Sequence, residues 1–263
     1  MDAQGTRAGV IAKRPPLQHV KETGLYYLGV LRDRGLTGFL KRLYLRALLR
    51  LHYLAFDRLS GGDIAVATSR CAAISKLPVI GSNQRHAIDY EPTPVAPFYW
   101  LRTVLPKDRD RWTFVDIGAG KGRTLALAST LGFEKVVGIE FADSLCAEAR
   151  DMLRAQNLDT DGRIRVETAD ATAFDVPDGP CVFYLFTPFG AEVVRGFLDN
   201  VLASHARNPR PMLFVYYYPA QAQEFETRPT LREVALPALL ALKLKVASPY
   251  SARVFEVRDA AKA

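Results

Sequence analysis

Residues 114–123 read Phe114-Val115-Asp116-Ile117-Gly118-Ala119-Gly120-Lys121-Gly122-Arg123, and this stretch decides the fold. An apolar run leads through three alternating glycines into residues 124–128, which favour a helix. The order predicts a strand, a tight turn and a helix N-terminus. Glycine adopts positive φ without a Cβ penalty, and the first amides of a helix have no partner within it. The turn therefore predicts a site for a nucleotide-like cofactor.

Three kinds of cofactor turn compete at this point, and their spacings differ. A P-loop ends in Gly-Lys-Ser/Thr, whereas Lys121 is followed by Gly122 and Arg123, so no hydroxyl is placed for magnesium. A dinucleotide turn needs a third small residue where this chain has the bulky Arg123. Asp116 adds a carboxylate before the first glycine, where it can engage an ammonium group. This combination resembles motif I of the class I S-adenosylmethionine (SAM) dependent methyltransferases.

Acidic residues after the next two predicted strands extend the resemblance. Residues 135–140 predict a strand that ends in Glu140, and residues 164–167 predict a strand followed by Asp170 and Ala171. Strand ends of an open α/β sheet gather at one edge, where ligands bind. The resemblance implies the following cofactor contacts: Asp116, Gly118, Ala119 and Gly120 hold the methionine half of SAM, Glu140 holds the ribose, and Asp170 with Ala171 holds the adenine.

The remaining pattern predicts an α/β fold. Apolar runs indicate further strands at 181–186, 212–216, 243–246 and 252–257, and helical spacing indicates helices at 98–104 and 143–157. With right-handed crossovers, these elements give a Rossmann-like, doubly wound, mostly parallel seven-stranded sheet with a helical N-terminal extension. The last two strands are expected to form the antiparallel hairpin by which methyltransferase sheets differ from dehydrogenase sheets.

The chain divides into two predicted domains, a basic arm with an amphipathic helix at 1–84 and a methyltransferase domain at 85–263. Residues 36–59 carry an apolar stripe beside several arginines and lysines. The formal net charge is +7, and much of the excess lies in residues 7–50. Such a helix packs on its own domain, lies on an anionic membrane surface or contacts nucleic acid, and we rank these in that order.

The segment from Tyr90 to Thr93 immediately precedes the core. It resembles the Tyr-x-Pro-Thr/Ser box that precedes motif I in seven-strand lysine methyltransferases. That resemblance implies that Tyr90 and Thr93 contact the cofactor carboxylate or wall the acceptor channel. A rigid linker, held extended by Pro92 and Pro94, accounts for the same residues equally well.

The residues after the fourth predicted strand bear on the acceptor. Thr187, Pro188 and Phe189 occupy the position of the Asn/Asp-Pro-Pro-Tyr/Phe motif of amine- and amide-directed methyltransferases, but threonine replaces the amide or acid and one proline is missing. Phe189 can still present its ring to an alkylammonium group or a base. The alternative is a turn that ends the strand and places a phenylalanine in the core.

Other features bound the function. The three cysteines are widely spaced and the four histidines lack metal-ligand spacing, so neither a disulfide framework nor a metal site is predicted. The polar N-terminus lacks a signal core, and together with the cysteines it predicts a cytoplasmic protein. We expect a SAM-dependent methyltransferase acting on nitrogen, with Thr187, Phe189 and Tyr90 as candidate catalytic residues. A protein lysine is the favoured acceptor, followed by a small molecule or RNA. A NAD-binding oxidoreductase and a non-catalytic SAM-binding scaffold are the alternatives from other classes.

Overall fold

The computed structural model of the chain describes residues 35–40, 43–52, 91–158, 161–186 and 189–258. Contacts divide the chain into two units, Met1–Ala47 and Leu48–Ala263. The described residues between 35 and 52 are helical, as the sequence predicts for this part of the segment 36–59. The rest of that helix and the predicted domain boundary at 84/85 lie outside the described residues.

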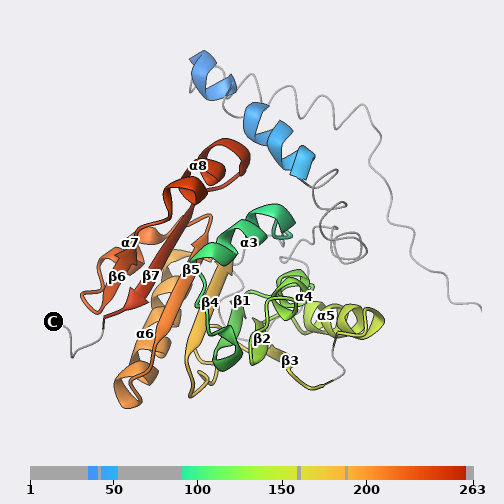
Figure 1. Cartoon of the computed structure of the whole chain (residues 1–263), viewed down its shortest axis with the longest axis vertical. Helices are drawn as coiled ribbons and strands as arrows, with labels where there is room; N and C mark the ends of the chain where they lie inside the picture. Colours follow the sequence, from blue (N-terminus) through green and yellow to red (C-terminus); the bar gives the residue numbers. More distant parts are fainter. Residues whose placement is uncertain (1–34, 41–42, 53–90, 159–160, 187–188, 259–263) are drawn as a thin grey trace, which may run out of the picture. The chain divides into compact units, whose positions relative to one another are not determined.

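A seven-stranded sheet forms the centre of the second unit, with the order β3-β2-β1-β4-β5-β7-β6 (Figure 1). Neighbouring strands from β3 to β5 are parallel, whereas β7 is antiparallel to both β5 and β6. The predicted Rossmann-like, mostly parallel sheet is therefore confirmed. The strands are β1 (Thr113–Ile117), β2 (Lys135–Glu140), β3 (Ile164–Thr168), β4 (Cys181–Phe186), β5 (Met212–Tyr217), β6 (Leu231–Val234) and β7 (Ala252–Val257).

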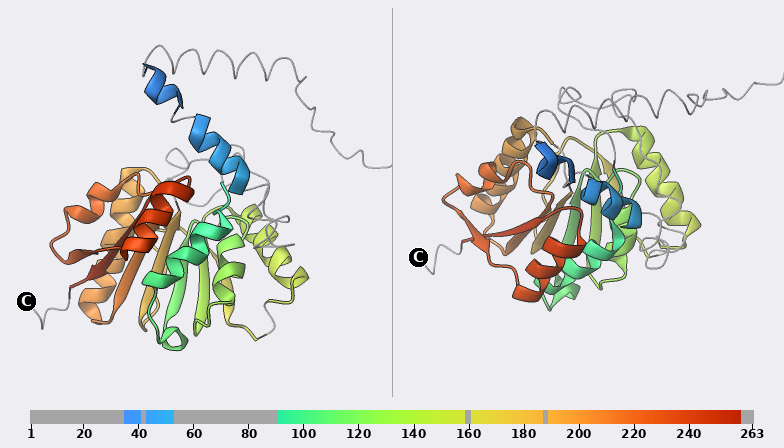
Figure 2. Two further views of the ribbon diagram at one scale, coloured as in Figure 1. Left: turned by 45° about the horizontal axis from the view of Figure 1, so that its top comes forward. Right: turned by 90° about the horizontal axis from the view of Figure 1, so that it is seen from above.

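Helices cover both faces of the sheet, so each face contributes to a separate apolar core (Figure 2). Residues of α3, α4, α5 and α8 pack on one face, and residues of α6 and α7 pack on the other. Because both faces are covered, β1, β4 and β5 are buried at every position. The helices are α3 (Val95–Leu101), η4 (Arg102–Val104), η5 (Arg109–Arg111), α4 (Arg123–Ser129), α5 (Asp143–Ala155), α6 (Ala191–Arg207), α7 (Ala222–Glu226) and α8 (Ala238–Ala247).

The segment that contains residues 243–246 is helical, so the predicted strand is wrong there. Alternation of lysine with leucine and valine imitates the period of a strand. However, Pro237 precedes a run of alanine and leucine, which are strong helix formers, and it occupies the N-cap of α8. Leu240 and Leu244, one helical turn apart, are both buried. Burial of this stripe fixes the helix.

The predicted hairpin between 243–246 and 252–257 is wrong for the same reason. The antiparallel partner of β7 at the sheet edge is β6, which the sequence analysis did not identify. Only Leu231 of this strand is buried. Arg232 and Glu233 instead pair with Glu256 and Arg253 on β7. A short, charged edge strand has too little apolar alternation to stand out in the sequence.

Helix α3 begins at Val95, three residues before the predicted start at Phe98. Proline is tolerated in the first turn of a helix, where its missing N–H has no partner to lose. Pro97 therefore lies inside the helix and is buried. The helix continues into η4, which ends at Val104 as the sequence predicts.

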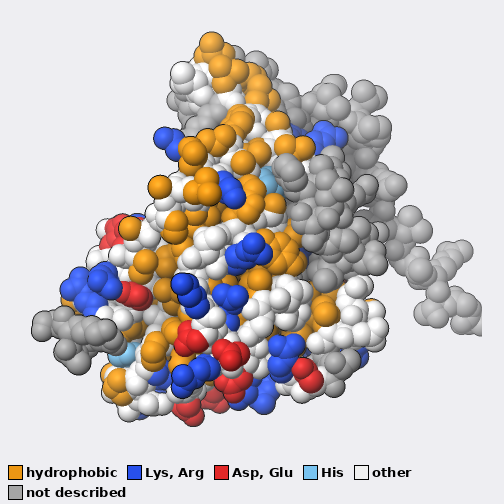
Figure 3. All heavy atoms as spheres, in the orientation of Figure 1, with side chains coloured by type: hydrophobic (Ala, Val, Ile, Leu, Met, Phe, Trp, Pro, Cys, Tyr) orange, Lys and Arg blue, Asp and Glu red, His pale blue; other side chains and the backbone are white. Residues whose placement is uncertain are grey.

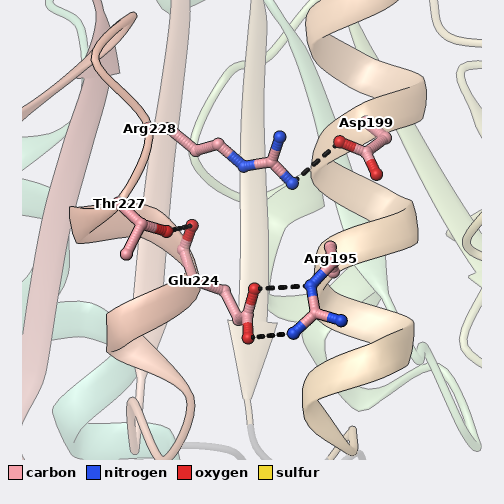
Figure 4. Close-up of polar contacts among 5 residues, drawn as sticks. All are labelled: Arg195, Asp199, Glu224, Thr227 and Arg228. Carbon is pink, nitrogen blue, oxygen red and sulfur yellow. Dashed lines mark hydrogen bonds and ion pairs between the residues drawn. The ribbon is translucent and has the colours of Figure 1, made fainter.

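Two ion pairs fasten α7 and the turn that follows it to α6 (Figure 4). Arg195 donates to both carboxylate oxygens of Glu224, at 3.1 and 2.8 Å, and Arg228 lies 2.8 Å from Asp199. Exposed pairs of this kind stabilise a fold by about 0–1 kcal/mol each, so their main effect is on orientation. Among the described helices, none is both long and apolar enough to cross a bilayer.

Candidate active site

The glycine turn after β1 is held against the end of β2. The amides of Gly118 and Ala119 donate to the carbonyl of Ile139 at 2.8 and 3.0 Å, and the Gly120 amide donates to Glu140 Oε2 at 2.9 Å. Gly118, Gly120 and Gly122 all have positive φ, at 81°, 52° and 78°. Side chains with a Cβ rarely adopt this region, so the turn requires glycine at these positions.

Two buried carboxylates lie at the ends of β1 and β2, beside this turn. Asp116 and Glu140 are each only 3% exposed. Glu140 accepts hydrogen bonds from two backbone amides, one on each oxygen: Gly120 on Oε2 and Ala142 on Oε1 at 3.0 Å. An ionised carboxylate can accept about four hydrogen bonds, so Glu140 retains capacity for further donors.

Burial changes the acidity of both groups. It raises the pKa of Asp116 to about 8, with a further rise from the neighbouring Glu140 charge and a smaller opposing effect from the Thr124 hydroxyl. Burial also raises the pKa of Glu140, against the effect of the amides that it accepts from. A cationic ligand would favour the ionised forms, since an opposite charge nearby lowers the pKa of a carboxyl group. Perturbed acids at a strand edge are typical of functional sites.

The free energy of unfolding should depend on pH through Asp116. Its carboxyl has a pKa of about 8 when folded against an ordinary value of 3.8. Between these values the unfolded chain is ionised while the folded chain stays protonated, so stability should fall as pH rises, by up to about 1.4 kcal/mol per pH unit. Below pH 3.8 Asp116 is protonated in both the folded and the unfolded chain, and above about pH 8 it is ionised in both. In neither range does this group make the free energy of unfolding depend on pH. Urea unfolding across the window should show a shallower slope for Asp116→Asn, and equal slopes would contradict the shifted pKa.

Arg123 and Thr124 bind the segment that precedes the core, a role that the sequence analysis did not assign. Arg123 is 1% exposed, and its guanidinium Nη1 donates to the Thr93 carbonyl at 3.1 Å. The Thr124 hydroxyl donates to the Thr93 hydroxyl at 3.3 Å. The start of α4 therefore holds Thr93, itself 4% exposed, beside the glycine turn. The available sequence signal was a charged residue opening an otherwise apolar helix.

Phe189, a candidate catalytic residue, lies against the glycine turn. A Cβ on Gly118 would stand 2.7 Å from Cζ of its ring. The chain after β4 thus reaches the turn after β1, across the point where the strand order reverses. Open α/β sheets bind ligands at this point. The other two catalytic candidates, Tyr90 and Thr187, lie outside the described residues.

The predicted adenine residues lie after β3, the strand next to β2. Asp170 is half-buried, and its Oδ1 accepts from the amide and the hydroxyl of Thr172 at 2.9 and 2.8 Å. Ala171 is buried. The amide of Ala169 donates to the Glu140 carbonyl at 2.9 Å, which joins this loop to the end of β2. The three predicted groups of cofactor residues therefore lie at or just after the ends of β1, β2 and β3, which are adjacent in the sheet.

Part of the chain is similar to known proteins in sequence and in structure. Residues 114–207 match a family described as "Methyltransferase domain". No curated protein sequence matches the chain. Among solved structures, the chain is similar to the 23S rRNA methyltransferase ErmE, with 14% identity and a TM-score of 0.42 over 64% of this chain and 69% of that chain.

Two further solved structures are longer than the part they share with this chain. The mitomycin 7-O-methyltransferase MmcR has 16% identity and a TM-score of 0.44, over 63% of this chain and 54% of that chain. TrmN from Thermus thermophilus has 20% identity and a TM-score of 0.43, over 64% of this chain and 49% of that chain. The chain thus spans about half the length of each of these two proteins.

The sheet order and the glycine turn with its two buried acids define a Rossmann-like α/β fold, and the family match places a methyltransferase domain on it. The matched residues run from β1 to the end of α6, which includes every strand end of the candidate cofactor site. Residues 114–207 of the chain are therefore assigned to a methyltransferase domain.

Proposed function

We propose that this enzyme transfers the methyl group of SAM to a nitrogen acceptor, with a protein lysine as the favoured acceptor. The observation that carries the proposal is the bond between Glu140 Oε2 and the Gly120 amide, which joins a buried carboxylate to the glycine turn. This contact joins an acidic acceptor of hydrogen bonds to a glycine turn, where a ligand can approach the backbone closely.

The side chains at the candidate site have the chemistry needed to bind SAM. Glu140 retains acceptor capacity for two ribose hydroxyls, and Asp116 offers a carboxylate whose ionisation a cation would favour. Glycine and alanine at 118–120 have no side chain or a single methyl group, so we propose that the methionine part approaches the backbone here. When bound, SAM supplies a methyl group already activated by a sulfonium. The proposed contacts are those predicted above: Asp116, Gly118, Ala119, Gly120 and Thr93 for the methionine part, Glu140 for the ribose, and Asp170 with Ala171 for the adenine.

Methyl transfer from SAM requires mainly that the protein positions the acceptor nitrogen and the methyl carbon. The acceptor nitrogen gives its lone pair to the methyl carbon, the carbon–sulfur bond breaks, and its electron pair stays on sulfur. An amine acceptor arrives as an ammonium and loses one proton before attack, and desolvation favours that loss. Holding the nitrogen and the methyl carbon in line at contact distance supplies most of the rate. We propose that Phe189, which lies at the glycine turn, orients the acceptor, and we propose the same role for Tyr90 and Thr187.

A nitrogen on a lysine side chain is favoured by the resemblance of the segment ending at Thr93 to the box of lysine methyltransferases. The contacts of Thr93 with Arg123 and Thr124 support this choice of acceptor, because they hold the segment beside the glycine turn. A rigid linker without any ligand contact would need the same anchoring. A small molecule or RNA remains the second proposal for the acceptor.

Two experiments test this function. Calorimetric titration with SAM, S-adenosylhomocysteine and NAD should give binding of the first two only, and binding of NAD alone would favour an oxidoreductase. Incubation of the enzyme with tritium-labelled SAM and a cell lysate should label a band that protease removes and nuclease leaves. A label removed by nuclease would point to RNA, and no label despite SAM binding would point to a non-catalytic scaffold.

We also propose that the enzyme makes a peripheral contact with an anionic membrane surface, but through α8 rather than through the basic helix at 36–59 considered above. Leu239, Leu242 and Val246 on this helix are 65%, 57% and 58% exposed. Figure 3 shows hydrophobic side chains over α8 with lysine and arginine side chains beside them. No aspartate or glutamate occurs in residues 238–247. Exposed apolar groups beside cations suit the boundary of an anionic lipid layer.

This contact should depend on Lys243 and Lys245. Each lysine near an anionic surface contributes about 1 kcal/mol, so replacing both by serine should weaken binding to phosphatidylserine vesicles by roughly thirtyfold. Vesicle sedimentation measures the effect, with vesicles of phosphatidylcholine as the uncharged reference. The matched control replaces the exposed Lys107 and Lys135 by serine. Equal binding by the wild type, the variant at Lys243 and Lys245, and the control variant would rule out this contact.

A further inference from the structure

Four aromatic side chains gather where β4 and β5 end and β7 begins. The rings of Phe186 and Tyr217 lie 5.1 Å apart, and the ring of Tyr250 lies 5.7 and 5.8 Å from them. The Tyr218 ring stacks on Tyr250 at 4.4 Å, with 13° between the planes. Because β7 runs antiparallel to β5, its start lies at the same edge as the ends of β4 and β5. The cluster therefore stands at the edge where α/β sheets bind ligands, beside the proposed cofactor site.

Tyr218 has an unusual backbone conformation for a bulky residue. Its φ is 57°, and it is one of two described residues other than glycine with positive φ. A bulky residue in this region is an outlier, and such outliers cluster at functional sites. The backbone is fixed on both sides, since the Tyr218 amide donates to the Ser251 carbonyl and the Tyr218 carbonyl accepts from Ala220, both at 2.8 Å. The side chain nevertheless remains 40% exposed.

Glu91 brings a carboxylate to this cluster. The Tyr250 hydroxyl donates to Glu91 Oε1 at 2.9 Å. Glu91 is two residues from Thr93, which Arg123 and Thr124 hold beside the glycine turn. One short segment therefore joins the aromatic cluster to the proposed cofactor site.

We propose that Glu91, Tyr218 and Tyr250 form the subsite that receives the acceptor as an alkylammonium group, such as a lysine side chain. This inference rests on the proposed function and names the acceptor class of that site. The face of a tyrosine ring attracts a cation, and a carboxylate beside it adds a full negative charge. The same carboxylate repels the phosphates of RNA, so the subsite favours a cationic amine over a nucleic acid.

Binding of two small probes tests the subsite without methyl transfer. Nα-acetyl-lysine N-methylamide carries the ammonium group, and the norleucine analogue has a similar chain without the charge. Ligand-observed NMR measures the affinity of each for the full chain, with and without S-adenosylhomocysteine. The lysine probe should bind about tenfold more tightly than the norleucine probe. Equal affinities would overturn the subsite. Failure of S-adenosylhomocysteine to bind would instead overturn the proposed function. The two outcomes can be told apart, because the affinities of the two probes can also be compared without S-adenosylhomocysteine.

Variants separate recognition of the cation from a structural role. Tyr218→Leu and Glu91→Gln should each reduce the preference for the lysine probe by about fivefold, in line with exposed cation–π and ion-pair contacts. Tyr218→Phe keeps the ring and should retain the preference within about twofold. Glu134→Gln, an exposed carboxylate before β2, is the matched control and should change nothing. Loss of affinity for both probes to the same extent in Tyr218→Leu and Glu91→Gln would show a structural role and overturn the proposal.

Discussion

Replacing Gly118 by alanine is expected to abolish most of the affinity for S-adenosylhomocysteine, with a loss of at least about tenfold. The new Cβ would stand 2.7 Å from Cζ of Phe189, and the backbone has a φ of 81° that alanine adopts poorly. Relief requires either a move of the Phe189 ring or a change in the turn. Both alter the surface on which we propose that the methionine part of SAM rests. Calorimetry measures the affinity, and urea unfolding measures the cost to stability, expected at about 1–2 kcal/mol.

Gly132→Ala is the matched control for this variant. Gly132 has nearly the same φ, at 80°, but a Cβ there would meet no atom within 4 Å. The two variants should therefore lose similar free energy of unfolding from the backbone, while only Gly118→Ala loses affinity for S-adenosylhomocysteine. Similar affinities in both variants would mean that the turn at Gly118 is not part of the cofactor site.

Glu140→Gln is expected to weaken binding of S-adenosylhomocysteine by about a hundredfold. Hydrogen bonds to a charged group contribute about 1.5–3 kcal/mol each, so loss of two ribose contacts corresponds to about 3 kcal/mol. The new amide would also present N–H groups toward the amide of Gly120 or Ala142, which now donates to the carboxylate. This clash should lower the free energy of unfolding by about 1–3 kcal/mol.

A pair of ligands separates loss of ribose contacts from collapse of the turn. If Glu140 binds the ribose hydroxyls, the wild type should prefer adenosine to 2′,3′-dideoxyadenosine, and Glu140→Gln should lose that preference. A collapsed turn would weaken both ligands equally. A preference that survives the substitution would remove Glu140 from the ribose site.

The central strands were predictable because their sequence signals are local. β2, β4 and β7 have the predicted bounds. The errors arose where tertiary packing overrode a local pattern. Polar and apolar residues alternate at 243–246 as they do in a strand. However, this segment forms a helix that buries Leu240 and Leu244 against one face of the sheet. β6 was missed because its sequence has little apolar alternation. It forms a strand because it pairs with β7.

The candidate site was predictable only where it follows strand ends. Asp116 and Glu140 were named because carboxyl ends of parallel strands meet at one edge. The buried position of Arg123, its bond to Thr93 and the bond between Tyr250 and Glu91 join residues far apart in the chain. Neither residue type nor spacing indicates such partners, which depend on how the segment before β1 crosses the sheet edge. Ring positions around Tyr218 depend in addition on its positive φ.

A crystal structure of the complex with S-adenosylhomocysteine tests the central claim most directly. We expect density for the ligand at the glycine turn, with both ribose hydroxyls within hydrogen-bond distance of Glu140 and the sulfur on the side of Phe189. Density for the ligand at another place, or a Glu140 carboxylate bonded only to Gly120 and Ala142 with side chains filling the space beside the turn, would contradict the cofactor site proposed here.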